Sequence, residues 1–303
     1  YLFSILNNFS KNKKNILLQG DSWAEQLTNK ERENYYLAEN YVKKFTKKNK
    51  FGFINAGVSS YSPTLMQLQY KILKENFNIS PDVVIAIVEQ TDIGDELCRY
   101  KNKKIFKNGE LVSVKEENFA QNAFDYSQVY GESEVLLKSG SRFKKTFNLI
   151  NYRIYYNYKK FIFNLSAKSE KQNTCQWSEI QRYLKNSTDD EINYFKNSIE
   201  SYVNYLINDY KIKNILLVTF PHKNHLNNNE NKYYHNVSNI LDEINFKNEK
   251  VLHLNFSKLI NDKEITIDKD SFYKNDPYSH LSDEFYANIF IKEILNKVGS
   301  LLN

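Results

Sequence analysis

Three side chains that together can activate a hydroxyl group lie in two short segments near opposite ends of the chain. Ser22 follows Gly20 and Asp21 at the end of an apolar run, and Asp276 and His280 share one C-terminal segment. A carboxylate that binds one imidazole nitrogen leaves the other nitrogen able to take a proton from a hydroxyl. The combination predicts a nucleophilic Ser22 with His280 as base and Asp276 as orienting group. Each segment alone also fits an ordinary turn or helix cap.

The residues around Ser22 predict a strand, a turn and a helix. Residues 15–18 have the length and composition of a buried strand, and residues 24–49 have apolar positions at helical spacing that end in a Lys-rich turn. Such a junction would place the Ser22 hydroxyl at the carboxyl edge of a sheet, where open α/β folds bind ligands. The first N–H groups of the helix would face developing negative charge there.

The rest of the chain alternates predicted strands and helices, a pattern typical of a parallel sheet with right-handed crossovers. Further strands are expected at 51–55, 82–88, 214–220 and 251–254, and helices at 63–77, 189–209, 230–247 and 282–298. We expect one α/β domain over residues 1–303, a three-layer α/β/α sandwich with a parallel sheet of about five strands. With 41% hydrophobic residues the chain can form a sizeable core, which excludes a disordered protein.

The alternation is interrupted at residues 100–187, which we interpret as an inserted hairpin and helical subdomain, a lid or a substrate-binding cap. A hairpin is expected within 104–113, turning at Asn108-Gly109, and a long helix rich in Tyr and Phe at 141–168. Residues 141–171 carry a net charge of +7 against +6 for the whole chain. Positive charge is therefore confined to this insertion.

This basic segment is compatible with three roles. Arg142, Lys144 and Lys145 are candidates for binding an acidic glycan, with neighbouring aromatic rings against the sugars. Peripheral contact with an anionic membrane, or a solvated face of an amphipathic helix, would fit the same residues. Nucleic acid is not an expected partner, because the charge is local and no nucleic-acid motif is present.

Neither a cofactor nor a metal is expected. Cys98 and Cys175 have no metal-ligand spacing and cannot form a disulfide framework, and His222 and His225 lack a third ligand nearby. His253, inside a predicted strand, is interpreted as a core residue with satisfied hydrogen bonds. No apolar run reaches the roughly 18 to 20 residues needed to cross a bilayer, and the chain shows no targeting segment.

In four separated blocks the sequence resembles the SGNH (GDSL-like) hydrolases, which are named for Ser, Gly, Asn and His. Ser22 matches the first block, Gly57 the second at the end of its strand, and the segment from Asp276 to His280 the fourth. The family more often has two residues between that Asp and His, against three in this chain. The order of the blocks agrees over nearly the whole chain outside the insertion.

The third block departs from the family pattern, usually Gly-x-Asn-Asp, because this chain has Glu89-Gln90-Thr91-Asp92. The resemblance implies an oxyanion hole built from the backbone N–H groups of Ser22 and Gly57, with Thr91 at the position of the Asn donor. Losing one such donor costs on the order of 100- to 1000-fold in rate. Gln90 could substitute and is a candidate substrate-binding residue. Glu89 fits either a solvated strand end or the lining of a polar pocket.

The resemblance implies a serine esterase that removes O-acetyl groups from a carbohydrate or surface glycan. Family members act on O-acylated carbohydrates of bacterial surface polymers as esterases or as O-acetyltransferases, and these blocks do not separate the two. A third possibility is a catalytically weak carbohydrate-binding protein on the same fold. The expected partner is an O-acylated carbohydrate, and the expected compartment stays open between the cytoplasm and the periplasm of a bacterium.

Overall fold

A computed structural model gives the structure of most of the chain outside residues 116–186. It divides the chain into two compact units, residues 1–113 with 178–303, and residues 114–177. The residues described are 3–7, 13–28, 35–115, 187–226, 236–244, 246, 248–265, 272–274 and 280–302. The predicted helix at 141–168, Arg142, Lys144, Lys145 and Asp276 lie outside the described residues.

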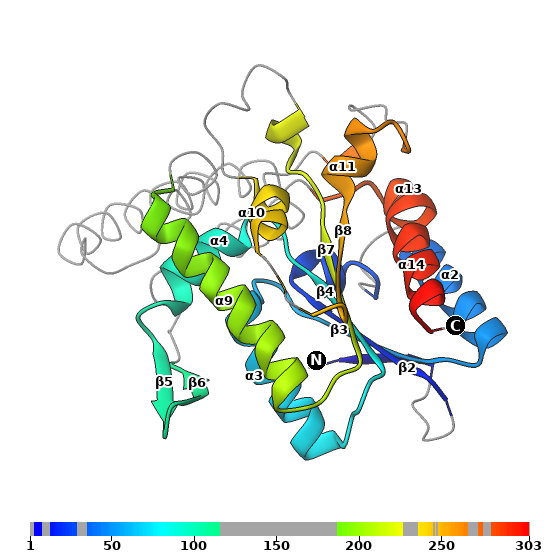
Figure 1. Cartoon of the computed structure of the whole chain (residues 1–303). Coiled ribbons are helices and arrows are strands. Elements are labelled where there is room, and N and C mark those ends of the chain that lie inside the picture. Colours follow the sequence, from blue (N-terminus) through cyan, green and yellow to red (C-terminus); the bar gives the residue numbers. More distant parts are fainter. Residues whose placement is uncertain are drawn as a thin grey trace, which may run out of the picture. The chain divides into compact units, whose positions relative to one another are not determined.

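The first unit is built on a six-stranded sheet with the strand order β1-β3-β2-β4-β7-β8 (Figure 1). Five strands are parallel, and β1 pairs antiparallel with β3 at one edge. The strands are β1 (Ser4–Asn7), β2 (Asn15–Gly20), β3 (Gly52–Gly57), β4 (Val83–Ile87), β7 (Asn214–Thr219) and β8 (Val251–Asn255). In chain order the parallel strands run 2-1-3-4-5, the doubly wound flavodoxin-like order. The predicted α/β fold class and its five parallel strands are confirmed.

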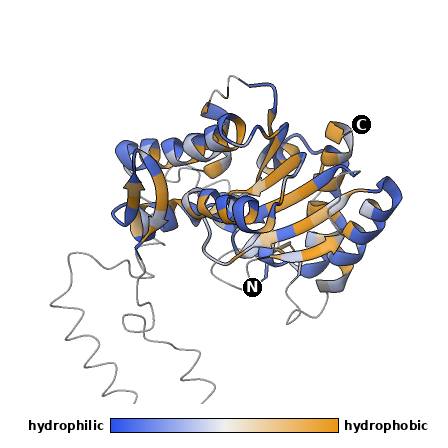
Figure 2. Cartoon of the chain, turned by 90° about the horizontal axis from the view of Figure 1, so that it is seen from below, coloured by the Kyte–Doolittle hydropathy of each residue, from blue (hydrophilic) through white to orange (hydrophobic). Residues whose placement is uncertain are grey.

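Helices cover both faces of the sheet, because successive side chains of a buried strand point to opposite faces. Ile16 and Leu18 of β2 belong to the core beneath one set of helices, and Leu17 to the core beneath the other. Figure 2 shows the apolar strands between the two helical layers. On the first face lie α2 (Tyr35–Asn49), η3 (Tyr286–Ile291) and α14 (Lys292–Leu302); on the second lie α3 (Pro63–Phe77), α9 (Asp189–Asn208) and α10 (Val237–Glu243).

The helix predicted at 24–49 is wrong, since the chain forms a short α1 (Ser22–Glu25) and a separate α2. After α1 the backbone tightens, because Leu27 N–H and Thr28 N–H donate to carbonyls only three residues back. Asn55 of β3 then donates from Nδ2 to the carbonyl of Ala24 at 3.0 Å and to the Thr28 hydroxyl at 3.0 Å. These contacts end the helix and bind its last turn to the sheet.

Two other predicted helices differ in length or form. The helix predicted at 230–247 is observed as the shorter α10, which begins where the Asn236 side chain accepts a hydrogen bond from Ser238 N–H at 2.8 Å. The C-terminal helix is a continuous series of α13 (Asp283–Phe285), the π-helical η3 and α14. Within the described residues no helix combines the length and the apolar character that a membrane span requires.

The predicted hairpin is present as β5 (Lys104–Lys107) and β6 (Glu110–Val114), and it follows α4 (Asp92–Gly94) and the π-helix η1 (Asp95–Tyr100). Both turn residues have positive φ, 53° at Asn108 and 82° at Gly109. This is the left-handed pair that a two-residue type I′ turn requires.

Candidate active site

Ser22 lies where β2 passes into α1, at the carboxyl edge of the sheet. Gly20 ends the strand with φ of 150°, and an added Cβ there would lie 3.0 Å from both Ala24 and Ile87. Asp21 caps the helix, because its Oδ1 accepts from Trp23 N–H at 2.9 Å. The chain therefore turns sharply and presents Ser22 as the first residue of α1.

The C-terminal segment brings His280 to this turn. The Ser22 Oγ lies 2.7 Å from His280 Nε2. His280 is buried, with 8% of its surface exposed, while Ser22 is partly exposed. The segment is held from both sides, since the His280 carbonyl accepts from Lys274 N–H at 2.7 Å and Gln26 Nε2 donates to the Leu281 carbonyl at 2.9 Å. The structure thus unites two of the three predicted catalytic side chains, and the third, Asp276, is outside the described residues.

Gly57 lies against α1, and its lack of a side chain is a packing requirement. An added Cβ would lie 2.3 Å from the Glu25 nitrogen and 2.4 Å from the Ala24 carbonyl carbon. The Gly57 N–H, one of the predicted oxyanion donors, donates to Asn55 Oδ1 at 3.0 Å. By contrast, the Ser22 N–H is in the first turn of a helix, where N–H groups have no partner within the helix.

Thr91 and Gln90, the other residues predicted to contact substrate, bond to groups of the protein itself. The Thr91 hydroxyl donates to the Glu89 carboxylate, and the Thr91 N–H donates to Glu89 Oε2 at 2.8 Å. Gln90 is buried, and its Oε1 accepts from Val237 N–H at 2.9 Å at the start of α10. The Thr91 hydroxyl therefore already donates its proton to Glu89. The contacts of Thr91 and Gln90 with substrate stay predictions.

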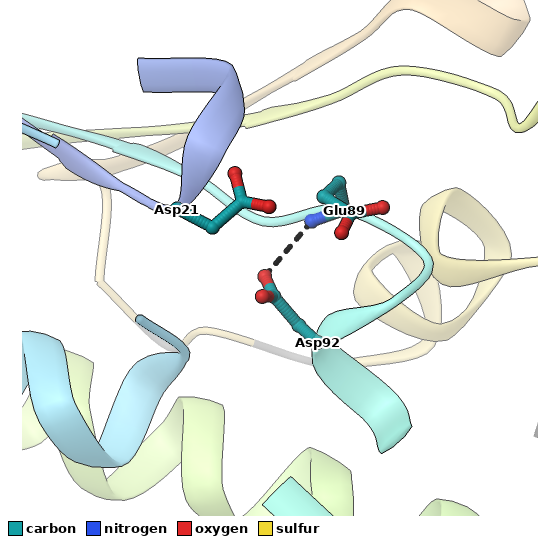
Figure 3. A group of neighbouring side chains, drawn as sticks. All are labelled: Asp21, Glu89 and Asp92. Atoms are coloured by element: carbon teal, nitrogen blue, oxygen red, sulfur yellow. Dashed lines mark hydrogen bonds between the residues drawn. The ribbon is translucent and has the colours of Figure 1, made fainter. Parts of the chain in front are cut away.

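Beside Ser22 is a cluster of three buried carboxyl groups, Asp21, Glu89 and Asp92 (Figure 3). Asp92 Oδ2 accepts from Glu89 N–H at 3.0 Å, and Asp21 Oδ2 lies 3.3 Å from the Ser22 hydroxyl. The interpretation of Glu89 as a solvated strand end is wrong, because only 2% of its surface is exposed. Their position in the sequence could have indicated this burial, since Glu89 and Asp92 directly follow an apolar strand that is buried on both faces.

Burial raises the pKa of all three carboxyl groups, and those of Glu89 and Asp92 rise well above their ordinary range. Repulsion from Asp21 adds to the effect at both residues. A side-chain hydrogen bond between Asp21 and Glu89 lowers the pKa of Asp21 and raises that of Glu89. Attraction by His280 also lowers the pKa of Asp21, against the larger effect of burial.

The same cluster is where a cation would fit best in the described part of the chain. One oxygen from each of Asp21, Glu89 and Asp92 lies within 4.8 Å of the others. Carboxylate oxygens suit Ca²⁺ or Mg²⁺. The raised pKa values of these groups nevertheless favour protons over a cation as the means of neutralising their negative charge.

His222 and His225 follow the carboxyl end of β7 and are both buried. Their ring centroids are 5.9 Å apart. Burial, with a smaller effect from His222, lowers the pKa of His225 to about 4. His225 is therefore a neutral imidazole at physiological pH.

No protein-family model matches the chain, and neither does any curated protein. Among solved structures, the chain is similar to a catalytic mutant of Axe2, an acetylxylan esterase from Geobacillus stearothermophilus, with 10% identity and a TM-score of 0.48 over 96% of this chain and 97% of that one. It is also similar to a protein assigned to the G-D-S-L lipolytic family from Desulfitobacterium hafniense DCB-2, with 10% identity and a TM-score of 0.41 over 94% and 99%.

Proposed function

We propose that the chain is a serine-dependent ester hydrolase of the SGNH type. The observation that carries this proposal is the 2.7 Å contact between Ser22 Oγ and His280 Nε2 at the carboxyl edge of the sheet. The two residues are far apart in sequence, and a partly exposed hydroxyl beside a buried imidazole is the nucleophile and base pair of acyl transfer. The sequence blocks around Ser22, Gly57 and His280 support the same family.

The reaction follows from these two side chains. His280 Nε2 takes the hydroxyl proton as Ser22 Oγ forms a bond to the ester carbonyl carbon, and the carbonyl oxygen becomes negative. The bond to the leaving alcohol then breaks, and the alcohol receives the proton from His280. Water, deprotonated by His280, attacks the acyl-Ser22 carbonyl, which releases the acid and returns the proton to Ser22.

Stabilisation of the oxyanion depends first on the backbone of α1. The Ser22 N–H is at the helix start, whereas the Gly57 N–H would have to leave Asn55 Oδ1 to reach the oxyanion. Catalytic hydrogen bonds often tighten only in the complex with substrate. We expect a modest turnover number while the Gly57 N–H stays bonded to Asn55 Oδ1. If substrate binding frees this N–H group for the oxyanion, the turnover number should be higher.

The favoured substrate is an O-acetyl group on a carbohydrate, as the sequence resemblance implies. Transfer of the acetyl group from Ser22 to a sugar hydroxyl would use the same steps, with an alcohol in place of water. Incubating the protein with an acetyl donor and a glycan separates the two. Acetyl groups found on the glycan indicate a transferase, and free acetate alone indicates an esterase.

A catalytically weak carbohydrate-binding protein is the second candidate, and one observation favours it. The Gly57 N–H and the Thr91 hydroxyl, both implied as oxyanion donors, already bond to Asn55 and Glu89. A site that kept Ser22 and His280 but lost two donors would lose much of its rate.

A fluorophosphonate distinguishes these candidates, because it reacts with an activated serine. We expect one covalent adduct by intact mass on the wild type and none on Ser22→Ala. The matched control is Ser59→Ala, which removes an exposed hydroxyl that donates to Glu25; it should label like the wild type. Absence of an adduct on folded wild-type protein would contradict the esterase proposal and favour the binding protein.

A further inference from the structure

A second candidate site lies in a cavity between the β5–β6 hairpin and helices α9 and α3. Its volume is about 750 Å³, within the range of small-molecule sites. In Figure 1 the hairpin lies beside α9 and α3. The lining part of α9 is its C-terminal half, which leads into the start of β7, so the cavity is on the side of the amino edge of the sheet. Ser22 is at the carboxyl edge, and we name this second site the hairpin cavity.

Uncharged polar side chains line the hairpin cavity from all three elements. Ser201, Asn204 and Asn208 recur at three- and four-residue spacing, which places them on one face of α9. Gln67 comes from α3 and Asn108 from the hairpin turn. None of these five side chains hydrogen-bonds to another group in the part of the chain that the structure describes.

Gln67 carries particular weight, because only 7% of its surface is exposed and its side chain lines the cavity. The residue is enclosed, while its amide oxygen and nitrogen stay accessible from the cavity. A ligand in the cavity can therefore both donate to and accept from this carboxamide. The exposed Asn204 and Asn208 could bond to the same ligand nearer the opening.

Aromatic rings complete the lining. Phe106 of the hairpin is 59% exposed and lines the cavity. Tyr205 and Tyr210 stand edge to face with centroids 4.9 Å apart, and their hydroxyls are 3.0 Å apart. Such rings offer flat apolar faces next to polar groups, which suit the C–H face and the hydroxyl rim of a sugar.

The charges around the hairpin cavity exclude an acidic ligand. Glu110 is paired with Lys71 at 2.6 Å, and Asp209 is exposed. The lining residues include no Lys or Arg. An anion would meet two carboxylates, and the ammonium group of Lys71 beside them is already paired with Glu110.

We propose that the hairpin cavity binds a neutral oligosaccharide. Carboxamides both donate and accept hydrogen bonds, as sugar hydroxyls do, so neighbouring Asn and Gln side chains match a row of hydroxyl groups. The residues that line the cavity include neither Ser22 nor any residue of the basic segment 141–171. Binding there requires no catalysis, so the inference can succeed or fail independently of the esterase proposal.

The test is calorimetric titration of the full chain carrying Ser22→Ala, which prevents turnover of any ester. The probes are xylohexaose, cellohexaose and chitohexaose, with hexagalacturonate as the acidic comparison. We expect saturable binding of at least one neutral probe. The double variant Asn204→Ala/Asn208→Ala should weaken it about tenfold or more, since each lost hydrogen bond lowers affinity severalfold. Phe106→Ala should weaken it as well.

The matched control is Asn193→Ala/Asn197→Ala. These two exposed Asn residues have the same spacing on the same helix and do not line the hairpin cavity. Binding in this control should equal that of the parent protein. The inference is overturned if no neutral probe binds, if both double variants weaken binding equally, or if hexagalacturonate binds best. Fluorophosphonate labelling of the Asn204→Ala/Asn208→Ala pair with Ser22 restored should be unchanged.

Discussion

Two histidines in this molecule contact a hydroxyl at nearly the same distance. His280 Nε2 lies 2.7 Å from Ser22 Oγ, and His253 Nε2 lies 2.8 Å from Thr219 Oγ1. His253 even shows a complete relay, because its Nδ1 lies 2.7 Å from Asp242 Oδ1. By the geometry of the polar atoms alone, the second pair is the better match to a catalytic triad.

Access to substrate separates the two pairs. Thr219 is the last residue of strand β7 and has 0% of its surface exposed, and its hydroxyl accepts from Ser238 Oγ at 2.8 Å. Ser22 is partly exposed on a strand-to-helix turn, where an ester can approach it. The His253 pair therefore fixes α10 against the sheet, as expected for a histidine with satisfied hydrogen bonds. A hydroxyl becomes a nucleophile only where the fold leaves it reachable.

Exchanging each histidine for glutamine should give opposite results, and this is the largest effect we expect. His280→Gln removes the base and should lower ester hydrolysis by about 1000-fold or more, with stability nearly unchanged. His253→Gln should keep activity within a few fold but lose about 1–3 kcal/mol, because Thr219 loses an acceptor in the core. Hydrolysis rates and urea unfolding measure both quantities. Loss of activity in folded His253→Gln would break the comparison.

Gly57→Ala should disturb only the Ser22 pair. The added Cβ would meet the backbone of α1 at 2.3 Å and 2.4 Å, so α1 and Ser22 must move. We expect a loss of about 3 kcal/mol in unfolding free energy. Activity per folded molecule should fall about tenfold or more, because small misplacements of a nucleophile are costly.

Gly299→Ala is the control for Gly57→Ala. The new methyl group would lie 3.6 Å from the Phe45 ring, an ordinary contact, and alanine favours the helical conformation of α14. Stability should stay equal or rise slightly, with activity unchanged. If Gly57→Ala behaved like this control, the close packing of β3 on α1 would not position Ser22.

The sequence predicted the parts of the fold whose signals are local. The continuous apolar runs gave β2 and β4, and Pro63 fixed the start of α3, so its predicted range was observed unchanged. β1 was missed, because four residues at a sheet edge carry too short a pattern to stand out. The single helix predicted at 24–49 failed because Asn55, distant in sequence, binds the end of α1.

In the candidate active site, too, local signals could be predicted and contacts between distant residues could not. The residue types of Ser22 and His280 suggested their pairing, since nucleophile and base must meet. The burial of Glu89 beside Asp21 could not be read from the chain, because it depends on packing between the end of β2 and the segment after β4. The His253 relay joins β7, α10 and β8, and no spacing along the chain indicates which hydroxyl the imidazole reaches.

The carboxyl groups near the Ser22–His280 pair and near the His253–Thr219 pair differ in burial. This difference should appear in how stability depends on pH, and it is the smallest effect that we expect. Burial, followed by repulsion from Asp21 and Asp92, raises the pKa of Glu89 well above 4.5. As pH rises above 4.5, unfolded chains release this proton while the folded protein keeps it. The unfolded state then binds fewer protons, so stability falls with rising pH.

Glu89→Gln removes that titration and keeps a side chain of the same shape that can accept from Thr91 N–H. Urea unfolding at pH 4.5 and pH 8 measures the free energy of unfolding of both proteins. Between these two pH values the variant should become more stable relative to the wild type by about 1 kcal/mol or more. At the His253 pair the carboxylate of Asp242 is instead 53% exposed. Parallel curves for Glu89→Gln and the wild type would mean that Glu89 is ionised when folded. The Ser22 pair would then lie beside a buried negative charge at Glu89 as well as beside Asp21.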